Sequence, residues 1–400
     1  MKKEIIKYIV VFLGLITIFV GYSTLVCSLP TERIKTNISS DIFEMSHEGD
    51  YPFAIISKRP YFMDNYTDAM MLNINYTLDN KNPLKAAMTA EWSNFVDENM
   101  TGSLQKLTNG ETCSWTGDYA RYWHGNAYLL RLFLFFTDYS TIRWMLYVIS
   151  SVLMLILSVK LYQTLGMKKS VAFVTGLLFV NVFVTQFSIQ FFTTVHLAII
   201  ASILMCVYSK SRKKILLISF IIGCLTSYFD LFTTPLLSCG LPLIVYVSLE
   251  EEDSLKNRFI SVFLFGFLWA IGYLLTWVSK WALGTIFTDI NVFKNAFDQF
   301  LTWSNNDGFS RFDAITDNFA LLPVSFIYMI LALLLPLVII AFNKKAIKTN
   351  LLLLIAVALP YIMVFCYCQT MLASHLVRIS NASHCHHSSI FYFHQFYFLG

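Results

Sequence analysis

Charge is scarce in this sequence. Asp, Glu, Lys and Arg make up 14% of its 400 residues, whereas an ordinary soluble domain carries about 25%. Apolar residues account for 56% of the chain, and its mean hydropathy is +0.59. We therefore interpret the chain as an integral membrane protein.

Several familiar signatures are missing as well. No Walker loop, GxGxxG, HExxH or GxSxG pattern occurs in a supporting context, so ATP-driven transport by this chain alone is not indicated. The eight cysteines form no disulfide framework, because Cys206, Cys224 and Cys239 lie inside apolar runs. The net charge of +4 comes from short loops and not from a basic face, which argues against nucleic acid as a partner.

The apolar runs predict an all-α polytopic membrane protein. A helix needs about 20 apolar residues to cross a bilayer core of about 30 Å. The run in residues 1–26 exceeds the roughly 7–15 apolar residues of a signal peptide, so we interpret it as an uncleaved helix. About nine transmembrane helices are expected, near residues 8–26, 143–161, 171–189, 194–208, 215–231, 234–249, 259–279, 323–342 and 350–369.

Basic residues predict the orientation of these helices, because Lys and Arg near span ends concentrate on the cytoplasmic side. They fall here in alternate loops, beginning with Lys2, Lys3 and Lys7 before the first span. We expect a multi-pass protein of the cell membrane with a cytoplasmic N-terminus and with spanning helices in contact with the lipid bilayer. The loop at 27–142 and the loop at 280–322 are then both extracytoplasmic.

The layout divides the remaining chain into a bundle at 143–279, two last spans at 323–369 and a Cys/His-rich tail at 370–400. The long first loop is expected to carry amphipathic surface helices, because Tyr122, Leu129 and Phe133 fall near one helical face. The alternative is that residues 125–137 start the next span early.

The stretch "YFMDNYTDAMMLN" at 61–73 places Asp64 and Asp68 four residues apart. On a helix both carboxylates face the same way. Nearby like charges raise one carboxyl pKa, which makes an acid and a base from two identical side chains. We predict a catalytic pair, with a divalent metal ion between the carboxylates as an option. The alternative is that Asp64 only caps a helix.

A second polar group lies in "GDYARYWHG" at 117–125, where Asp118, Arg121 and His124 recur every three residues. Arg offers a rigid fork of donors for phosphate oxygens, and His exchanges protons near neutral pH. With Arg131 further along, the stripe predicts a phosphate cradle at the membrane surface. The alternative is anchoring, because Tyr, Trp and Arg gather at bilayer boundaries.

Two more ionisable residues lie near the bilayer at predicted outer span ends, His196 in "QFFTTVHLAII" and Asp230 in "YFDLFTTPL". Ionisable groups at membrane depth are costly, so a functional role is the default hypothesis, against simple placement at headgroup level. Gln186 and Gln190 would line the same mouth and bind sugar hydroxyls, or instead join helices by hydrogen bonds.

The second outer loop and the tail carry weaker signals. Carboxylates among aromatic residues in the loop suit a carbohydrate or a plain amphipathic surface helix; they are Asp289, Asp298, Asp307, Asp313 and Asp317. Cysteine and histidine are dense in the tail, but their spacings match no familiar zinc finger. We therefore assign no metal ligand.

A first helix, a long outer loop and many later spans resemble the architecture of the GT-C class of membrane glycosyltransferases. Three stretches of the sequence are similar to a group of bacterial multi-span proteins of that architecture: "DNYTDAMMLN", "YARYWHG" and "SYFDLFTTPLL". The resemblance covers most of residues 1–370. It implies transfer of a sugar from a polyprenyl-phosphate donor to a cell-envelope acceptor, which is a polysaccharide, a teichoic acid or a protein.

The resemblance also implies roles for individual residues. Asp64 or Asp68 would act as base or metal ligand, and Arg121, with His124 or Arg131, would hold the lipid phosphate. Two other classes of function stay open. One is a transporter or exporter of a lipid-linked or polar solute, and the other is a non-catalytic envelope assembly protein.

Overall fold

The computed structural model describes residues 2–50, 52–56, 59–62, 64–179, 188–249 and 255–304. Within these ranges the chain is mostly helical, with fourteen α-helices and four short strands. It divides into two compact units, one of residues 1–52, 63–249 and 263–293, and one of residues 53–62, 250–262 and 294–400. The expected spans at 323–342 and 350–369, the tail, Gln186, Asp307, Asp313 and Asp317 lie outside the described residues.

Four described helices are long and apolar enough to cross a membrane: α1 (Lys2–Cys27), α8 (Tyr139–Leu165), α10 (Ile189–Val207) and α13 (Leu255–Phe287). Three shorter helices follow other predicted apolar runs: α9 (Met167–Phe179), α11 (Arg212–Phe229) and α12 (Leu237–Leu249). The helical class is therefore confirmed, and the four long helices are compatible with a multi-pass membrane protein. The larger number of nine spans stays a prediction.

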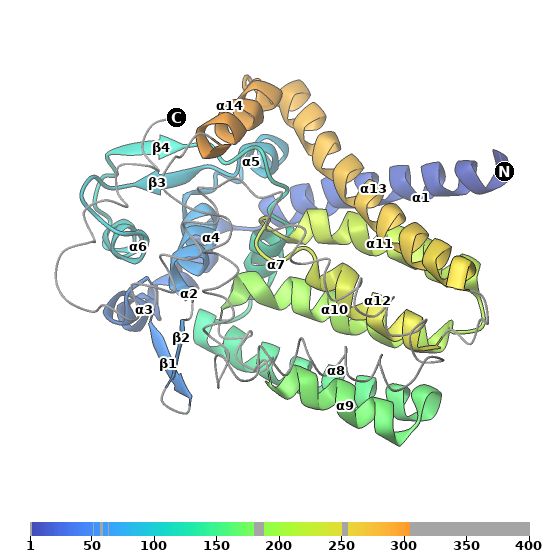
Figure 1. Cartoon of the computed structure of the whole chain (residues 1–400). Coiled ribbons are helices and arrows are strands. Elements are labelled where there is room, and N and C mark those ends of the chain that lie inside the picture. The colour runs from blue at the N-terminus through green and yellow to red at the C-terminus, as the bar shows by residue number, and fades with distance from the viewer. Residues whose placement is uncertain are drawn as a thin grey trace. The chain divides into compact units, whose positions relative to one another are not determined.

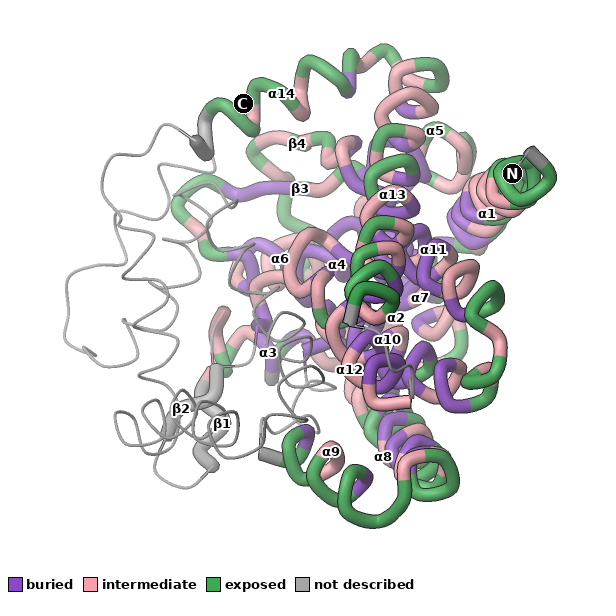
Figure 2. Tube along the Cα trace, turned by 45° about the vertical axis from the view of Figure 1, so that its right-hand side comes forward, coloured by how far each residue is buried: buried purple, intermediate pink, exposed green. Residues whose placement is uncertain are grey.

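In the first unit, α10 lies at the centre of the long helices. It is buried over 72% of its most apolar stretch, against 17% for α1 and 28% for α8. Figure 2 shows buried residues along α10 and α12 and exposed residues along the outside of α8. The exposed face of α8 is apolar, with Trp144 at 64% and Leu155 at 66% exposed, as a face toward lipid requires.

Small residues bring α11 and α13 close together. A Cβ atom on Gly223 would lie 2.0 Å from the carbonyl oxygen of Trp269, and one on Gly272 would lie 2.3 Å from that of Phe220. Ser219 Oγ also donates to the carbonyl oxygen of Phe265 at 2.6 Å. Such close backbone contact is typical of helices that pack within a bilayer, where small side chains favour association.

The part of residues 28–138 that belongs to the first unit packs together at one end of the long helices, and we call this end the head end (Figure 1). Its helices surround a core that includes Ile34, Met71, Ile74 and Leu104, all fully buried. These elements are α2 (Thr31–Ser39), α3 (Ile42–Glu48), α4 (Asn65–Thr77), α5 (Pro83–Thr89), α6 (Met100–Thr108), α7 (Gly125–Leu134), β3 (Trp92–Asn94) and β4 (Trp115–Gly117). The two strands are antiparallel, with Trp92 opposite Gly117.

α7 corrects two expectations for residues 119–136. Seven of its ten residues are buried, so it packs inside the head and does not lie along a surface. It also does not start the next span early, because α8 begins separately at Tyr139, where the Asp138 side chain accepts from the N–H of Thr141 at 2.7 Å. A side-chain cap of this kind marks a new helix N-terminus.

Three of the predicted basic loops lie at the opposite end of the first unit, which we call the basic end. Lys213 Nζ lies 3.2 Å from Glu4 Oε1, which joins the starts of α11 and α1. Lys169 Nζ donates to the carbonyl oxygen of Ser248 at 3.1 Å, which joins the start of α9 to the end of α12. Three of the predicted basic loops, at 2–7, 168–169 and 210–214, therefore lie at one end of the first unit.

The described part of the second unit is small. It contains an antiparallel hairpin of β1 (Phe53–Ile56) and β2 (Arg59–Phe62), with Phe53 opposite Phe62. It also contains residues 255–262 of α13 and most of α14 (Val292–Ser304).

Candidate functional site

Asp68 lies where the head meets the long helices. Its side chain is fully buried and accepts three hydrogen bonds. Tyr139 Oη donates to Oδ2 at 2.5 Å, the N–H of Ile189 donates to Oδ2 at 2.8 Å, and the N–H of Gln190 donates to Oδ1 at 3.2 Å. The last two donors open α10, so a carboxylate from α4 completes the N-terminus of another helix, where negative charge is stabilised.

Asp64, four residues earlier, is the N-cap of α4. Its carboxylate accepts from the N–H and the Oγ1 of Thr67, both at 3.0 Å, so the predicted helix cap is present. The cap is not its only contact, because Gln190 Nε2 also donates to Asp64 Oδ2. The N–H of Asp64 donates to Ser188 Oγ at 2.9 Å. The side chain remains 4% exposed.

Gln190 continues this network to the loop after α11. Its Oε1 accepts from Thr233 Oγ1 at 3.2 Å, and the N–H of Thr233 donates to Asp230 Oδ2 at 3.0 Å. Thr194 Oγ1 donates to Asp230 Oδ1 at 3.1 Å. A chain of hydrogen bonds therefore connects Asp64 to Asp230 through Gln190 and Thr233, and we call these four residues the acidic network.

His196 lies on α10 near this network but faces elsewhere. Its Nε2 is 3.1 Å from Ser150 Oγ of α8, and its Nδ1 is 2.6 Å from the carbonyl oxygen of Phe192. Both ring nitrogens therefore have partners within the long helices. His196 therefore does not join the hydrogen bonds around Asp64, and its contact with substrate stays a prediction.

Burial raises the proton affinity of Asp68 and Asp50 at the head end. Burial, together with the smaller effect of the nearby Asp64 charge, raises the pKa of the Asp68 carboxyl to about 6, against the opposing Arg143 charge and the hydrogen bonds from Tyr139 and the N–H of Ile189. Burial also raises the pKa of the Asp50 carboxyl. Asp68 thus exchanges its proton close to neutral pH, as a buried carboxyl beside another is expected to do.

The residues present do not fit a divalent ion between the two carboxylates. Donors of the protein already occupy both oxygens of Asp68, from Tyr139, Ile189 and Gln190. Across the described ranges, no group of three or more His, Cys, Asp or Glu is placed to hold a metal ion. Since hard cations need several oxygen ligands, we derive no step through a metal.

The second predicted stripe is not on a helix. Residues 118–124 form turns and irregular backbone before α7, so Asp118, Arg121 and His124 do not share a face. Asp118 is exposed, Arg121 is half-buried, and His124 is buried with 1% exposure. The spacing of three residues therefore predicted a polar face that the backbone does not form.

Arg121 is held within aromatic side chains. Its guanidinium carbon lies 4.7 Å from the centre of the Tyr119 ring and 5.6 Å from that of Tyr122. Its backbone carbonyl oxygen accepts from Nε1 of Trp277 at 3.0 Å and of Trp281 at 3.1 Å. Cation–π contact orients a guanidinium while leaving its N–H donors in plane for other groups.

His124 occupies the left-handed backbone region, with φ of 57°, at the start of α7. Its Nε2 lies 2.7 Å from the carbonyl oxygen of Tyr119. Burial, with the smaller effects of the Lys280 and Arg121 charges, lowers the pKa of the His124 imidazole to about 3, against the hydrogen bond with the Tyr119 carbonyl, which raises it. The imidazole is therefore neutral at pH 7, and we do not assign it a proton-transfer role.

Arg131 is fully buried and serves backbone groups. Its Nε donates to the carbonyl oxygen of Val26 at 3.1 Å, Nη1 to that of Asn75 at 2.9 Å, and Nη2 to that of Leu29 at 3.0 Å. Val26 ends α1 and Asn75 lies in the last turn of α4, where carbonyl groups lack helical partners. Arg131 therefore joins the head to α1, and we leave it out of the phosphate cradle.

Sequence reasoning missed Lys280, a fully buried lysine of α13. Its Nζ donates to the carbonyl oxygens of Ala87 at 3.1 Å and Met88 at 2.9 Å, which end α5. A single lysine inside the apolar stretch "TWVSKWALG" was the available signal. A cation in such a run is expected to have a partner in the protein.

Aromatic rings connect Arg121 to the acidic network. The Phe232 ring stacks on Trp277 with centres 5.4 Å apart, and Trp277 stacks on Tyr122 at 6.1 Å. Phe232 lies two residues after Asp230 and has a φ of 65°. The structure thus places Asp64, Asp68, Asp230 and Arg121 at the same end of the first unit.

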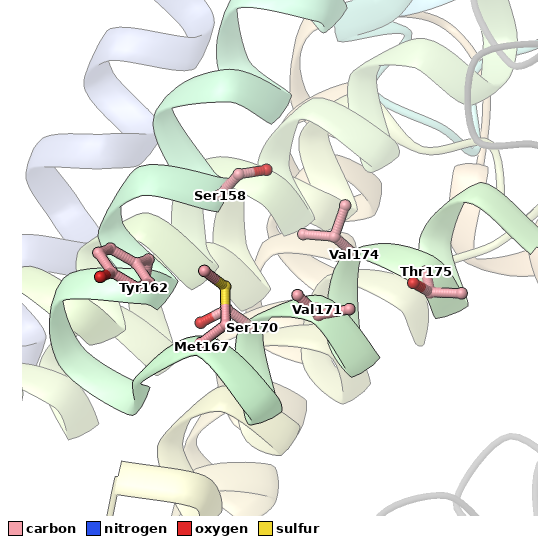
Figure 3. Close-up of a pocket in the computed structure, with 7 residues that line it drawn as sticks. All are labelled: Ser158, Tyr162, Met167, Ser170, Val171, Val174 and Thr175. Atoms are coloured by element: carbon pink, nitrogen blue, oxygen red, sulfur yellow. The ribbon is translucent and has the colours of Figure 1, made fainter.

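A hollow of about 340 Å³ lies elsewhere, between α8 and α9. Figure 3 shows its lining, which is Ser158, Tyr162, Met167, Ser170, Val171, Val174 and Thr175. Ser158 follows Tyr139 by nineteen residues of α8, or roughly 28 Å along a helix axis. The hollow is therefore toward the basic end and separate from the acidic network.

Comparison with known proteins gives no match. No family model matches the chain, and neither a curated protein nor a solved structure does so.

Proposed function

We propose that the protein is a membrane glycosyltransferase of about nine spans, which moves a sugar from a polyprenyl-phosphate donor to a polysaccharide, teichoic acid or protein acceptor. Its head end faces the outside of the cell membrane, and its N-terminus is cytoplasmic. The observation that carries the proposal is the acidic network, which holds Asp64 at the same end of the first unit as Arg121. Such a reaction needs a base for the attacking hydroxyl and a cationic ligand for the departing phosphate.

Asp64 is the base in this proposal. It retains a small exposed fraction of 4%, whereas Asp68 has none. Gln190 and Thr67 fix the direction of its carboxylate. It would take the proton of the attacking hydroxyl as the bond to the sugar forms, and a positioned base is worth about 10²–10⁴ in rate. Asp68 is a positioning residue, which holds α4 against the start of α10.

Arg121 binds the departing lipid phosphate in this proposal. Its half-buried guanidinium is oriented by Tyr119 and Tyr122, and charge-assisted hydrogen bonds to phosphate oxygens are strong in such a place. Asp118, Asp230 and His196 remain predictions for contacts with the sugar or the acceptor.

The test is lipid analysis of a deletion strain that carries single variants at equal protein level. Asp64→Asn should abolish transfer and let a polyprenyl-phosphate sugar accumulate, because the amide accepts no proton. Asp79→Asn is the matched control, since Asp79 is an exposed aspartate of the same head and should leave transfer intact. Full transfer with Asp64→Asn contradicts the assignment of the base.

A non-catalytic envelope assembly protein is the second candidate. It is favoured by one observation, that both oxygens of Asp68 are satisfied by donors within the fold. Under this alternative, Asp64→Asn and Asp79→Asn behave alike, and the cell phenotype follows the amount of folded protein. Accumulation of a lipid-linked sugar with Asp64→Asn alone separates the two candidates.

A further inference from the structure

α14 has one strongly apolar face. Phe293, Phe297 and Leu301 follow one another at intervals of four residues and are 44%, 61% and 43% exposed. At about 100° per residue, they span an arc of about 80°. Lys294, Asp298 and Gln299 fall outside this arc. Exposed aromatic and leucine side chains in this pattern are expected to be covered by something apolar.

The length and charge of α14 indicate that it does not span the membrane and does not bind an acidic surface by charge. Its thirteen residues make a helix of about 20 Å, which is too short to cross a core of about 30 Å. Its sequence contains one lysine and one acidic residue, Lys294 and Asp298, so its formal charge is zero. Attraction to an acidic surface therefore does not explain the exposed face, whereas burial of its phenylalanine and leucine side chains does.

The start of α14 is fixed to the end of α13, which is one of the four helices able to cross a membrane. The N–H of Val292 donates to Thr285 Oγ1 at 3.1 Å, and the Phe293 ring packs edge-on against Trp281 with centres 5.7 Å apart. Ile286 and Phe287, in the last turn of α13, are themselves 70% and 44% exposed. Val292 and Phe293, which begin α14, are thus attached where a span ends.

We propose that α14 is a membrane-surface helix whose Phe293, Phe297 and Leu301 side chains insert between the lipid headgroups of the bilayer. An amphipathic helix in this position buries its apolar face a few ångströms into the bilayer. Because the helix has no net charge, apolar burial and not charge provides the binding. The proposal goes beyond sugar transfer and does not depend on it.

The experiment uses the full chain in vesicles of neutral phosphatidylcholine. A photo-reactive benzoylphenylalanine replaces Phe297 in one variant and Gln299, which lies on the opposite side of the helix, in a matched control. After illumination, mass spectrometry identifies the adducts. We expect at least a five-fold higher yield of phospholipid adduct at position 297 than at 299, unchanged between 0.05 M and 0.5 M salt.

Other results would overturn the proposal. Adducts from position 297 to residues 305–400 would show that the rest of this chain covers the face. Adducts to a second copy would show a dimer interface. Equal phospholipid yields at positions 297 and 299, or no adduct at either, would show that the helix is not oriented at a lipid surface. A yield at position 297 that falls with salt would contradict binding by apolar burial.

Discussion

The two polar groups of the head look alike in the sequence and differ in the structure. Asp64 and Asp68 lie at the start of a real helix, and both make hydrogen bonds to Gln190. Asp118, Arg121 and His124 lie on irregular backbone and range from exposed to buried. Regular spacing therefore places side chains on one face only where the backbone is helical.

The same comparison shows how this fold accommodates buried charge. The Asp68 carboxylate meets the N–H groups that begin α10, whereas the Arg131 and Lys280 cations meet carbonyl groups that end α1, α4 and α5. Each charge has the sign that the helix end favours. These three buried charges join the head to the long helices through backbone groups, whereas Arg121 stays half-exposed.

The largest expected effect separates the two arginines of the head. Arg131→Met should lower the free energy of unfolding by several kcal/mol, because each buried carbonyl left without a donor costs about 1–3 kcal/mol. Arg121→Met, the matched control, should cost about 1 kcal/mol or less, because Arg121 is only half-buried. Thermal unfolding in detergent measures both. Equal losses would contradict the different roles of the two side chains.

A second effect concerns His124 and pH. The folded-state pKa of about 3 lies below the ordinary value of 6.5, so the unfolded chain binds a proton first as the pH falls. Stability should therefore decrease between pH 6.5 and about 3, by up to about 1.4 kcal/mol per pH unit. His124→Asn keeps a residue that tolerates a positive φ and should flatten this part of the profile. An unchanged slope would refute the contribution of His124.

Protonation of Asp68 should change the stability in the opposite direction to that of His124, over a narrower pH range. Its folded-state pKa of about 6 lies above the ordinary value of 3.8, so the folded protein binds the proton first. Its contribution to stability should rise as the pH falls from about 6 to about 4. Comparing unfolding of Asp68→Asn with the unmodified chain at several pH values isolates this contribution. A difference that does not change with pH would contradict the raised pKa.

The smallest expected effect is the coupling within the acidic network. A double-mutant cycle of Gln190→Ala with Asp64→Ala should show a coupling energy of about 1–2 kcal/mol, because the two side chains share a hydrogen bond. A cycle of Gln190→Ala with Asp118→Ala should show almost none, because Asp118 is exposed and outside the network. Equal coupling energies in both cycles would contradict a specific interaction between Gln190 and Asp64.

The sequence predicts the parts of this structure that depend on local composition. Apolar runs of sufficient length mark α1, α8, α10 and α13, and the word "DNYTD" marks the cap of α4 by Asp64. Both signals act within a few turns of one helix.

Contacts between distant segments could not be predicted in the same way. Asp64 and Gln190 are 126 residues apart, and only the packing of α4 against α10 brings them together. The sequence placed Gln190 at the mouth of a span, but it could not identify Asp64 and Thr233 as the partners of its side chain. The acceptors of Arg131 and Lys280 are backbone carbonyls, which every residue carries, so no sequence pattern identifies them.

The side of the membrane that the head faces tests the account most directly, because sugar transfer from an outer polyprenyl phosphate requires the acidic network and Arg121 to be outside. In a chain without other cysteines, Glu111→Cys places a thiol at an exposed position of the head, and Lys210→Cys places one at the basic end. A membrane-impermeant maleimide should label position 111 in intact cells and position 210 only after permeabilisation. Labelling of position 210 in intact cells, with position 111 protected until lysis, would contradict the account.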